Sequence, residues 1–213
     1  MRILVYSINL GGYDHLHESP KAKWKSIEDD FEYLYFTDGE APDGWTKVSH
    51  KTGTRKDSRY LKINSHLLPP HDISIYVDAA FIFTKSLKCI LEQIDLKDIA
   101  LSPHGKDDCV YKHGVTCIYN KLDDVYTIFK QVGRYANEGM PEGLGLTENG
   151  FIIRRNNGII KELNELWWQE YQQGSQRDQL SLPYALWKVK PDLTLLPFSL
   201  RDNKYLANFC GHK

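Results

Sequence analysis

The sequence has few cysteines, no long apolar segment and no excess of charge of one sign. Its four cysteines form no C-x-x-C pair, so we expect free thiols in a reducing compartment. The 27 basic and 28 acidic residues nearly cancel, which excludes the strong positive field of a general nucleic-acid binder. The N-terminal stretch MRILVYSINL reads directly as a strand, and no membrane-spanning segment follows, so we expect a soluble, cytoplasmic protein.

One group of cysteines and histidines is a candidate zinc site. Cys109, His113 and Cys117 are four residues apart, so a helix would place them on one face, with His104 just upstream. Gly114 weakens a helix here, and the spacing is not that of a zinc finger or ribbon. We therefore favour buried core cysteines over a zinc site.

Strand-like and helical patterns alternate along the chain, without a repeat or a low-complexity linker. With 41% hydrophobic residues, the chain can bury one substantial core, and we expect a single domain over residues 1–213. The alternation predicts an α/β fold with a mostly parallel central sheet flanked by helices, whose ligands bind beyond the carboxyl ends of the strands. We expect strands at 2–8, 32–37, 73–77, 99–102 and 151–155, and helices at 20–30, 54–68, 86–94, 122–135 and 159–171.

The segment SIYVDAAFIF, residues 74–83, contains a single carboxylate, Asp78, in an otherwise apolar run. An unpartnered buried carboxylate costs several kcal/mol, so we expect Asp78 to face a cavity, a cation or strong donors at the strand end. A nucleotide-sugar glycosyltransferase would use such a residue to hold Mg²⁺ or Mn²⁺ against the donor diphosphate. A phosphohydrolase of the haloacid dehalogenase type needs a second Asp two residues later, where Ala80 stands. The plainest alternative is a turn-capping Asp.

The segment GSQRDQLSLPYALW, residues 174–187, has the form of a helix start. Ser175 and Asp178 fit an S-x-x-D capping box, and Pro183 predicts a short or kinked helix. A cap does not require Arg177 and Gln179 beside Asp178. A helix N-terminus with these three side chains can orient hydroxyl groups and anions, so both interpretations stay open.

Several motifs, taken in order, resemble one known family. They are GGYD (11–14), YFTD (35–38), SIYVDAAF (74–81), HGKDDCVY (104–111), Q-x-x-x-Y-x-x-E-G-M-P (131–141), LWW (166–168) and SQRDQLS (175–181). Together, from about residue 5 to about residue 190, they resemble the DUF616 family of glycosyltransferase-like proteins. The resemblance implies a GT-A-like (Rossmann-like) domain, a nucleotide-sugar donor site on the first strands and a metal position at Asp78.

The resemblance also implies roles for individual residues. On the donor side it implies contacts from Tyr6, Ser7, Tyr13, Asp38, Arg59, Lys62, Asp78 and Ala80. At the reacting sugar and the acceptor it implies catalytic roles for Asp178 and Arg177 and contacts from Gln179, His104, Gln131 and Trp168. His212 is similar to a C-terminal histidine that completes the metal site in some GT-A enzymes; a frayed tail is the alternative.

Simple physical considerations bear on these roles. Arg59 and Lys62, three residues apart on a helix, share a face and can grip one pyrophosphate, unless that face is merely solvated. Trp167 falls on the apolar stripe and is predicted to be core, which leaves Trp168 to stack on a sugar or base or to pack against a helix. Family members usually carry Arg before the Asp of an H-x-x-R-D-C motif, where this chain has Lys106-Asp107-Asp108, and this departure leaves an anion contact there open.

The sequence therefore predicts a glycosyltransferase that moves a sugar from a nucleotide-sugar, with a UDP-sugar as the expected donor, to a glycan or other hydroxyl acceptor. Mn²⁺ or Mg²⁺ is the expected cofactor. A catalytically silent nucleotide- or carbohydrate-binding protein of the same fold is the first alternative, and a phosphohydrolase is the second. The sequence does not identify the sugar, the acceptor or the stereochemical outcome.

Overall fold

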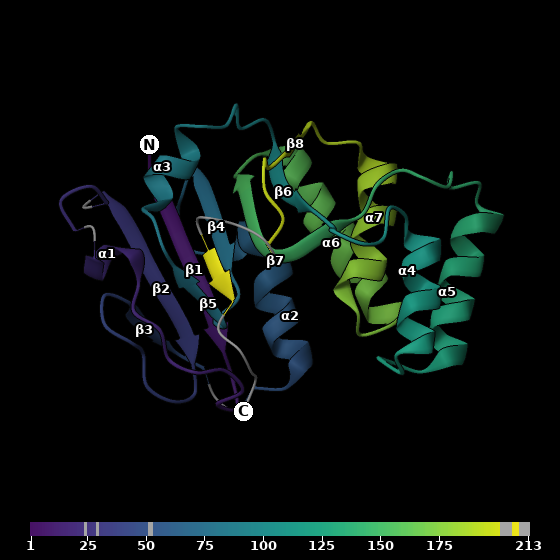
Figure 1. Ribbon diagram of the computed structural model, residues 1–213, viewed down its shortest axis with the longest axis horizontal. Coiled ribbons are helices and arrows are strands. Elements are labelled where there is room, and N and C mark those ends of the chain that lie inside the picture. The colour runs from purple at the N-terminus through teal and green to yellow at the C-terminus, as the bar shows by residue number, and fades with distance from the viewer. Residues whose placement is uncertain (24, 29, 51–52, 201–205, 209–213) are drawn as a thin grey trace.

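The structure, a computed structural model of the protein, describes residues 1–213 except for 24, 29, 51–52, 201–205 and 209–213. Its main sheet consists of β1 (Ile3–Asn9), β2 (Phe31–Thr37), β3 (Thr46–Ser49), β4 (Ile73–Val77), β6 (Ile99–Pro103), β7 (Thr147–Arg155) and β8 (Leu193–Leu195). The strand order is β3-β2-β1-β4-β7-β6-β8 (Figure 1). Strand β7 runs antiparallel to β4 and β6, and the other pairs are parallel. The predicted α/β fold with a mostly parallel sheet is confirmed.

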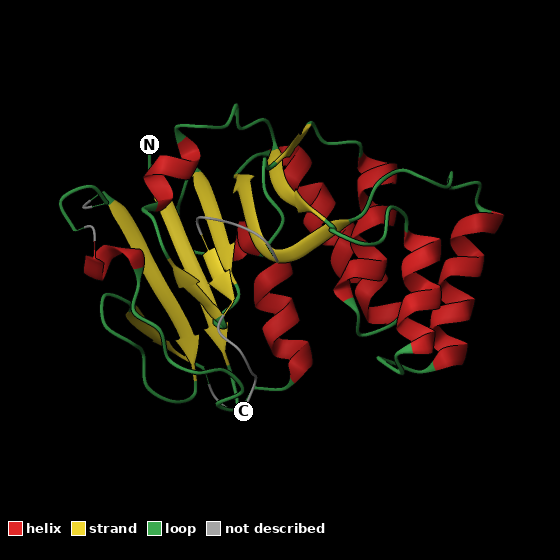
Figure 2. Cartoon of the chain, in the orientation of Figure 1, coloured by secondary structure: helices red, strands yellow, loops and turns green. Residues whose placement is uncertain are grey.

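Helices cover both faces of this sheet (Figure 2). The described helices are α1 (Pro20–Lys23), α2 (Arg55–Ile63), α3 (Leu87–Leu91), α4 (Val110–Tyr119), α5 (Val125–Asn137), α6 (Gly158–Gln173) and α7 (Asp178–Val189), with a 3₁₀ turn η1 at Ser65–Leu67. Two short strands, β5 (Phe81–Phe83) and β9 (Leu206–Asn208), form a separate antiparallel pair.

Alternation along β1 divides the core into two layers. Ile3 and Val5 face the apolar cluster that includes α3, whereas Leu4, Tyr6 and Ile8 face the cluster beneath α2, α6 and α7. Because successive strand residues point to opposite faces, a run that is apolar throughout belongs to a strand covered on both sides. All seven residues of β1 are buried, as this arrangement requires.

A third apolar cluster joins α4, α5 and α7 at one end of the molecule. Figure 1 shows α4 and α5 side by side there. We expected Gly114 to weaken a helix, but it lies inside α4. A Cβ at this position would stand 3.2 Å from Val132 Cγ1, so the glycine allows α4 to approach α5 closely. Close packing of the two helices thus offsets the low helix propensity of glycine.

Other local predictions were also wrong. The helix expected at 20–30 is described only at Pro20–Lys23. Helix α7 is not short, since it extends six residues beyond Pro183, whereas the alternative expectation of a kink stays a prediction. The sequence pattern did not indicate β3, β5 or β8, which are only three or four residues long. No finding bears on the expectation of one domain over 1–213, which stays a prediction.

Candidate functional site

Asp78 follows the carboxyl end of β4 and has the partners that its burial requires. The Tyr76 hydroxyl donates a hydrogen bond to Asp78 Oδ1, and Lys62 Nζ lies 3.8 Å from the same oxygen. The Asp78 N–H donates to the Gly150 carbonyl on β7 at 2.8 Å. The side chain is 37% exposed, so its second oxygen lies near the surface at the sheet edge. The expectation that Asp78 would face a cation and a strong donor is confirmed.

Two cations from α2 converge on a second carboxylate, Asp178, at the start of α7. Lys62 Nζ lies 2.7 Å from Asp178 Oδ2, and Arg59 Nε lies 3.7 Å from Asp178 Oδ1. Arg59 and Lys62 therefore share a face of α2, as their spacing predicted. The Lys62 side chain is only 2% exposed, and that of Asp178 is 8% exposed. We call Asp78, Lys62, Asp178 and Arg59 the charge cluster.

The electrostatics of the charge cluster keep Asp178 ionised. Burial by itself would raise the pKa of Asp178, but the nearby charges of Lys62 and Arg59 outweigh burial and hold the pKa well below its usual range. The Arg59 guanidinium responds in the opposite sense: burial would lower its pKa, but the Asp178 carboxylate raises it. Asp178 and Arg59 therefore both carry full charges at neutral pH.

The position of Lys62 is set from beneath by a buried arginine of β7. Arg154 is 0% exposed, and its guanidinium donates hydrogen bonds to the Lys62 carbonyl at 2.8 Å and the Ile63 carbonyl at 2.9 Å. It also donates to the Tyr6 hydroxyl, which itself donates to the Lys62 carbonyl at 2.9 Å. These bonds satisfy carbonyls that the end of α2 leaves without helical partners.

This arrangement places Tyr6, a predicted donor contact, inside the core at 0% exposure. Its hydroxyl supports α2 from within the protein. Sequence reasoning overlooked Arg154, although an arginine within the apolar strand FIIRR is itself a signal, because a buried charge needs several partners.

A turn near Asp38 forms a second part of the sheet's carboxyl edge. The Gly11 N–H donates to both Asp38 oxygens at 3.0 Å. Gly11 and Gly12 have φ values of +71° and +61°, which residues with a Cβ rarely adopt. Ser7 lies in the neighbouring strand, 1% exposed, and Tyr13 lies in the turn, 56% exposed. Since β1 and β2 are parallel neighbours, this turn and Asp38 meet at one edge.

The entry to α7 differs from the predicted capping box. The N-cap residue is Arg177, and no side chain caps the helix. The Ser175 hydroxyl donates to Asp123 Oδ2 at 2.6 Å and accepts the Arg177 N–H at 3.1 Å. Asp178 is the first helical residue and turns its carboxylate toward α2, because Lys62 and Arg59 offer stronger partners than backbone amides do. Arg177 Nη2 donates to Gln179 Oε1 at 3.1 Å.

The predicted acceptor-side residues do not gather at one point. Gln131 is 4% exposed: its Oε1 accepts the Ser175 N–H at 2.9 Å, which joins α5 to the segment before α7. Trp168 stacks on Tyr171, with ring centroids 5.5 Å apart, and meets the Tyr60 ring edge-on. Trp167 is fully buried, as predicted.

The remaining predicted contacts are His104, Ala80 and His212. His104 Nδ1 accepts the Asp107 N–H at 2.9 Å. Ala80 is partly buried near Asp78, between β4 and β5. His212 lies outside the described residues.

Surface pockets do not by themselves mark the charge cluster. A pocket of about 330 Å³ opens at the N-terminal end of α2 and is lined by residues that include Arg55 and Tyr171. Arg55 lies one turn before Arg59, so this pocket continues along the same face of α2. A pocket of about 450 Å³ near α1 is lined by Lys21 and Trp45 among others. Neither pocket is lined by a residue of the charge cluster. The candidate site is therefore identified from its charged side chains and not from a pocket.

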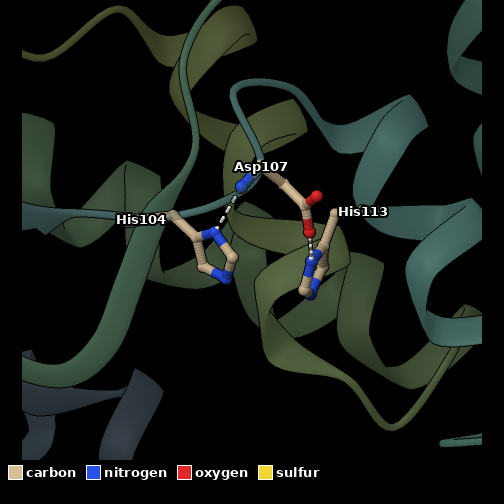
Figure 3. Close-up of side chains that lie close together, drawn as sticks. All are labelled: His104, Asp107 and His113. Carbon is tan, nitrogen blue, oxygen red and sulfur yellow. Dashed lines mark hydrogen bonds and ion pairs between the residues drawn. The ribbon is translucent and has the colours of Figure 1, made fainter. Parts of the chain in front are cut away.

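One group of side chains in the described part of the chain has the composition of a divalent metal site. It consists of His104, Asp107 and His113, whose ligand atoms lie within 4.8 Å of one another (Figure 3). The cysteines of the zinc candidate considered above do not belong to this group: Cys109 and Cys117 are buried and unpaired. Burial would raise the pKa of Asp107, but its hydrogen bond from His113 and the charge of that imidazole lower it.

The fold and the charge cluster define the class of protein. The strands form a mostly parallel seven-stranded sheet with β7 reversed, and helices cover both of its faces, which defines an α/β layer fold. Cations of α2 lie at the carboxyl edge of its parallel strands, where such sheets bind ligands.

Comparison with known proteins identifies the family. The family model described as "TOD1/MUCI70, glycosyltransferase-like domain" matches residues 46–212, and the chain belongs to this family. The predicted DUF616 resemblance is thereby confirmed. A similar solved structure is that of mouse xyloside xylosyltransferase 1 in its apo form, with a TM-score of 0.49 and 9% identity over 92% of this chain and 85% of that chain. A comparison with curated proteins finds no match. In the described residues, no helix has the length and apolarity needed to cross a membrane.

Proposed function

We propose that this protein is a glycosyltransferase that moves a sugar from a nucleotide-sugar, with a UDP-sugar as the expected donor, to an acceptor hydroxyl. The observation that carries the proposal is the charge cluster: Lys62 and Arg59, on one face of α2, both pair with Asp178, and Lys62 also lies beside Asp78 at the carboxyl end of β4. Family membership supports glycosyl transfer in general.

The donor diphosphate is the natural ligand for Lys62 and Arg59. Both cations now share the Asp178 carboxylate, and Lys62 also lies near Asp78. Glycosyl transfer leaves a nucleoside diphosphate, so positive groups fixed beside the leaving oxygens stabilise the charge that develops there. At the nucleotide end, the exposed Asp38 retains lone pairs for hydroxyl or base N–H donors. Ser7 and Tyr13 line the same edge.

Asp78 has the chemistry of a ligand for Mg²⁺ or Mn²⁺. Its Oδ2 lies against Gly150, where an added Cβ would stand only 2.9 Å away, so the glycine keeps this oxygen uncovered. Such hard cations are bound by one or two carboxylates together with substrate phosphates, and a single aspartate is a sufficient protein contribution. The ion, when bound, neutralises charge on the leaving diphosphate. His212, the predicted second ligand, lies outside the described residues.

The geometry favours an electrostatic role for Asp178. A general base works best when its pKa is near the working pH, whereas the pKa of Asp178 is held well below its usual range. We therefore assign Asp178 to hold Lys62 and Arg59 in position for the diphosphate, with Arg177 and Gln179 beside it toward the reacting sugar. Contacts of His104, Gln131 and Trp168 with the acceptor stay predictions.

The test is nucleotide binding and turnover by the purified protein. UDP and UDP-sugars, with and without Mn²⁺, are expected to raise the unfolding midpoint, because a ligand that binds only the folded state stabilises it. Arg59→Met should weaken UDP binding by about tenfold or more, the scale of one charge-assisted hydrogen bond. Lys161→Met, which removes an exposed cation on α6, is the matched control and should bind as the parent does.

Three outcomes are distinguishable. Stabilisation by UDP together with release of UDP from a UDP-sugar in the presence of acceptors supports the transferase. UDP binding without turnover over a broad acceptor set would instead make the protein a catalytically silent binding protein. No stabilisation by any nucleotide, or equal UDP affinity in Arg59→Met and the parent, would remove the donor site from α2.

A further inference from the structure

The junction between β6 and α4 brings together three side chains that the proposed function does not use as a group. His104 follows the last residue of β6, Asp107 lies in the connecting loop, and His113 lies in the first turns of α4. Figure 3 shows the two imidazole rings next to each other, with the Asp107 carboxylate directed at the nearer ring nitrogen of His113. The ring centroids are 5.0 Å apart. Three segments thus present two imidazoles and one carboxylate to the same space.

The side chains of this group are close enough to reach one ion after small movements. His113 Nδ1 and Asp107 Oδ2 are joined by a hydrogen bond of 2.7 Å, whereas two ligands of a tetrahedral Zn²⁺ would stand about 3.3 Å apart. A ring nitrogen of His104 lies within 4.8 Å of both partners. His113 is 4% exposed, and its Nε2 is buried without a hydrogen-bond partner among the described residues. Because only one nitrogen of this buried imidazole has a partner, the ring can change its tautomer, which ligation through Nδ1 requires.

We propose that His104, Asp107 and His113 form a binding site for one divalent transition-metal ion, with Zn²⁺ as the best fit. Two imidazoles and a carboxylate suit Zn²⁺ and its first-row neighbours, whereas Mg²⁺ prefers oxygen ligands only. The site differs in this respect from Asp78, which offers oxygen alone. Three protein ligands leave at least one coordination position for water.

Ligation follows a balanced exchange of protons and hydrogen bonds. The ion takes the place of the proton on His113 Nδ1 that bonds Asp107 Oδ2, and the neutral imidazole carries that proton on Nε2 instead, so ligation requires a change of tautomer. His104 Nδ1 now accepts the Asp107 N–H at 2.9 Å, so His104 must exchange this hydrogen bond for the metal bond. The Thr116 hydroxyl donates to the other Asp107 oxygen at 3.3 Å and orients the carboxylate in the manner of an outer-shell partner.

The site lies where the carboxyl edge of the sheet meets helix α4. Strands β4 and β6 both run antiparallel to β7, so Asp78 and His104 follow strand ends at the same edge of the sheet. Helix α4 packs against α7, whose first residue is Asp178. An ion at the β6–α4 junction would tie this edge of the sheet to the helices that carry the charge cluster. The metal site itself does not depend on the proposed transferase activity.

The test is Zn²⁺ binding by the untagged, EDTA-treated protein, measured by calorimetry with Zn²⁺ alone. One ion per chain is expected, with a dissociation constant below about 1 μM. Because buried His113 variants can fail to fold, the informative variants are His104→Gln and Asp107→Asn, each expected to weaken binding at least about tenfold. His66→Gln is the matched control, since His66 also lies beside a carboxylate, 4.0 Å from Glu165 Oε1.

Two further measurements distinguish this site from others. Asp78→Asn should leave Zn²⁺ affinity unchanged, which separates this site from the donor site whether or not the transferase proposal holds. Zn²⁺ should also raise the unfolding midpoint of the parent protein, and His104→Gln should abolish that increase. Unchanged affinity in both His104→Gln and Asp107→Asn, or absence of a bound ion in the parent, overturns the proposal.

Discussion

Asp178→Asn tests whether the charge cluster is held together by its buried carboxylate. The change removes one negative charge and nearly preserves the shape of the side chain. Lys62, 2% exposed, would lose its partner at 2.7 Å and keep only Asp78 at 3.8 Å. Breaking a buried ion pair from one side typically costs about 3–5 kcal/mol, because the remaining charge is left unpaired. The asparagine oxygen can still accept a hydrogen bond, so we expect a loss of about 3 kcal/mol near neutral pH.

The difference in unfolding free energy between the parent and Asp178→Asn should change with pH in one direction only. Because the folded-state pKa of Asp178 lies below its ordinary value of 3.8, its contribution to stability is fully present above that value. The contribution disappears as the pH falls through the lower, folded-state pKa. The stability gap between the parent and Asp178→Asn should therefore be constant from about pH 7 to about pH 5 and narrow below about pH 4.

Urea denaturation at several pH values measures this gap. Lys62→Met and the double variant complete a mutant cycle, and we expect a coupling energy of about 2 kcal/mol between the two residues, within the range for residues in contact. The cycle separates the ion pair from general effects of each substitution. A gap under about 0.5 kcal/mol near neutral pH, the level of an ordinary surface change, would refute the reasoning. So would a gap that persists unchanged in acid.

Three further predictions concern glycine substitutions and the buried Arg154. Gly150→Ala places a Cβ 2.9 Å from Asp78 Oδ2 and 2.8 Å from the Phe81 ring, and should lower stability by roughly 1–3 kcal/mol and weaken Mn²⁺-dependent UDP binding in calorimetry. Gly133→Ala meets nothing within 4 Å and should stabilise α5 by about 0.5–1 kcal/mol, whereas Gly114→Ala, crowded by Val132, should gain less or lose stability in urea unfolding. Arg154→Met leaves carbonyls of α2 unsatisfied and should cost about 3 kcal/mol or more; an unchanged thermal midpoint would contradict this.

Features with a local cause were predictable from the sequence. Strands β1, β2, β4 and β6 appear within one residue of their expected bounds, because apolar runs of this length fit the interior of a parallel sheet. Helix α2 begins one residue after its expected start, but it ends at Ile63, five residues before the expected end at residue 68. The shared face of Arg59 and Lys62 follows from helical spacing alone. The need of Asp78 for partners follows from the cost of burying a charge.

Features that depend on distant partners were not predictable. The Ser175–Asp178 pattern is a sound local cap, but the two α2 cations attract the Asp178 carboxylate away from the backbone. The family resemblance implied that Tyr6 contacts the donor. In the structure its hydroxyl instead accepts a hydrogen bond from Arg154, which is 148 residues away in the sequence. The metal group draws on a strand end, a loop and a helix. Spacing along the chain indicated His104 and His113 as metal candidates, but it grouped them with Cys109 and Cys117 and not with Asp107.

The bonds from Arg154 to the end of α2 also determine when the charge cluster can form during folding. They join residues 91 and 92 positions apart, and Asn164 on α6 accepts a further bond from the same guanidinium. Contacts of such long range form late, because the loop entropy must be overcome before they contribute. On the ribosome, Lys62 thus has no fixed position until β7 and α6 have emerged. A nascent chain or an N-terminal fragment would contain every donor-side cation and still bind diphosphate weakly.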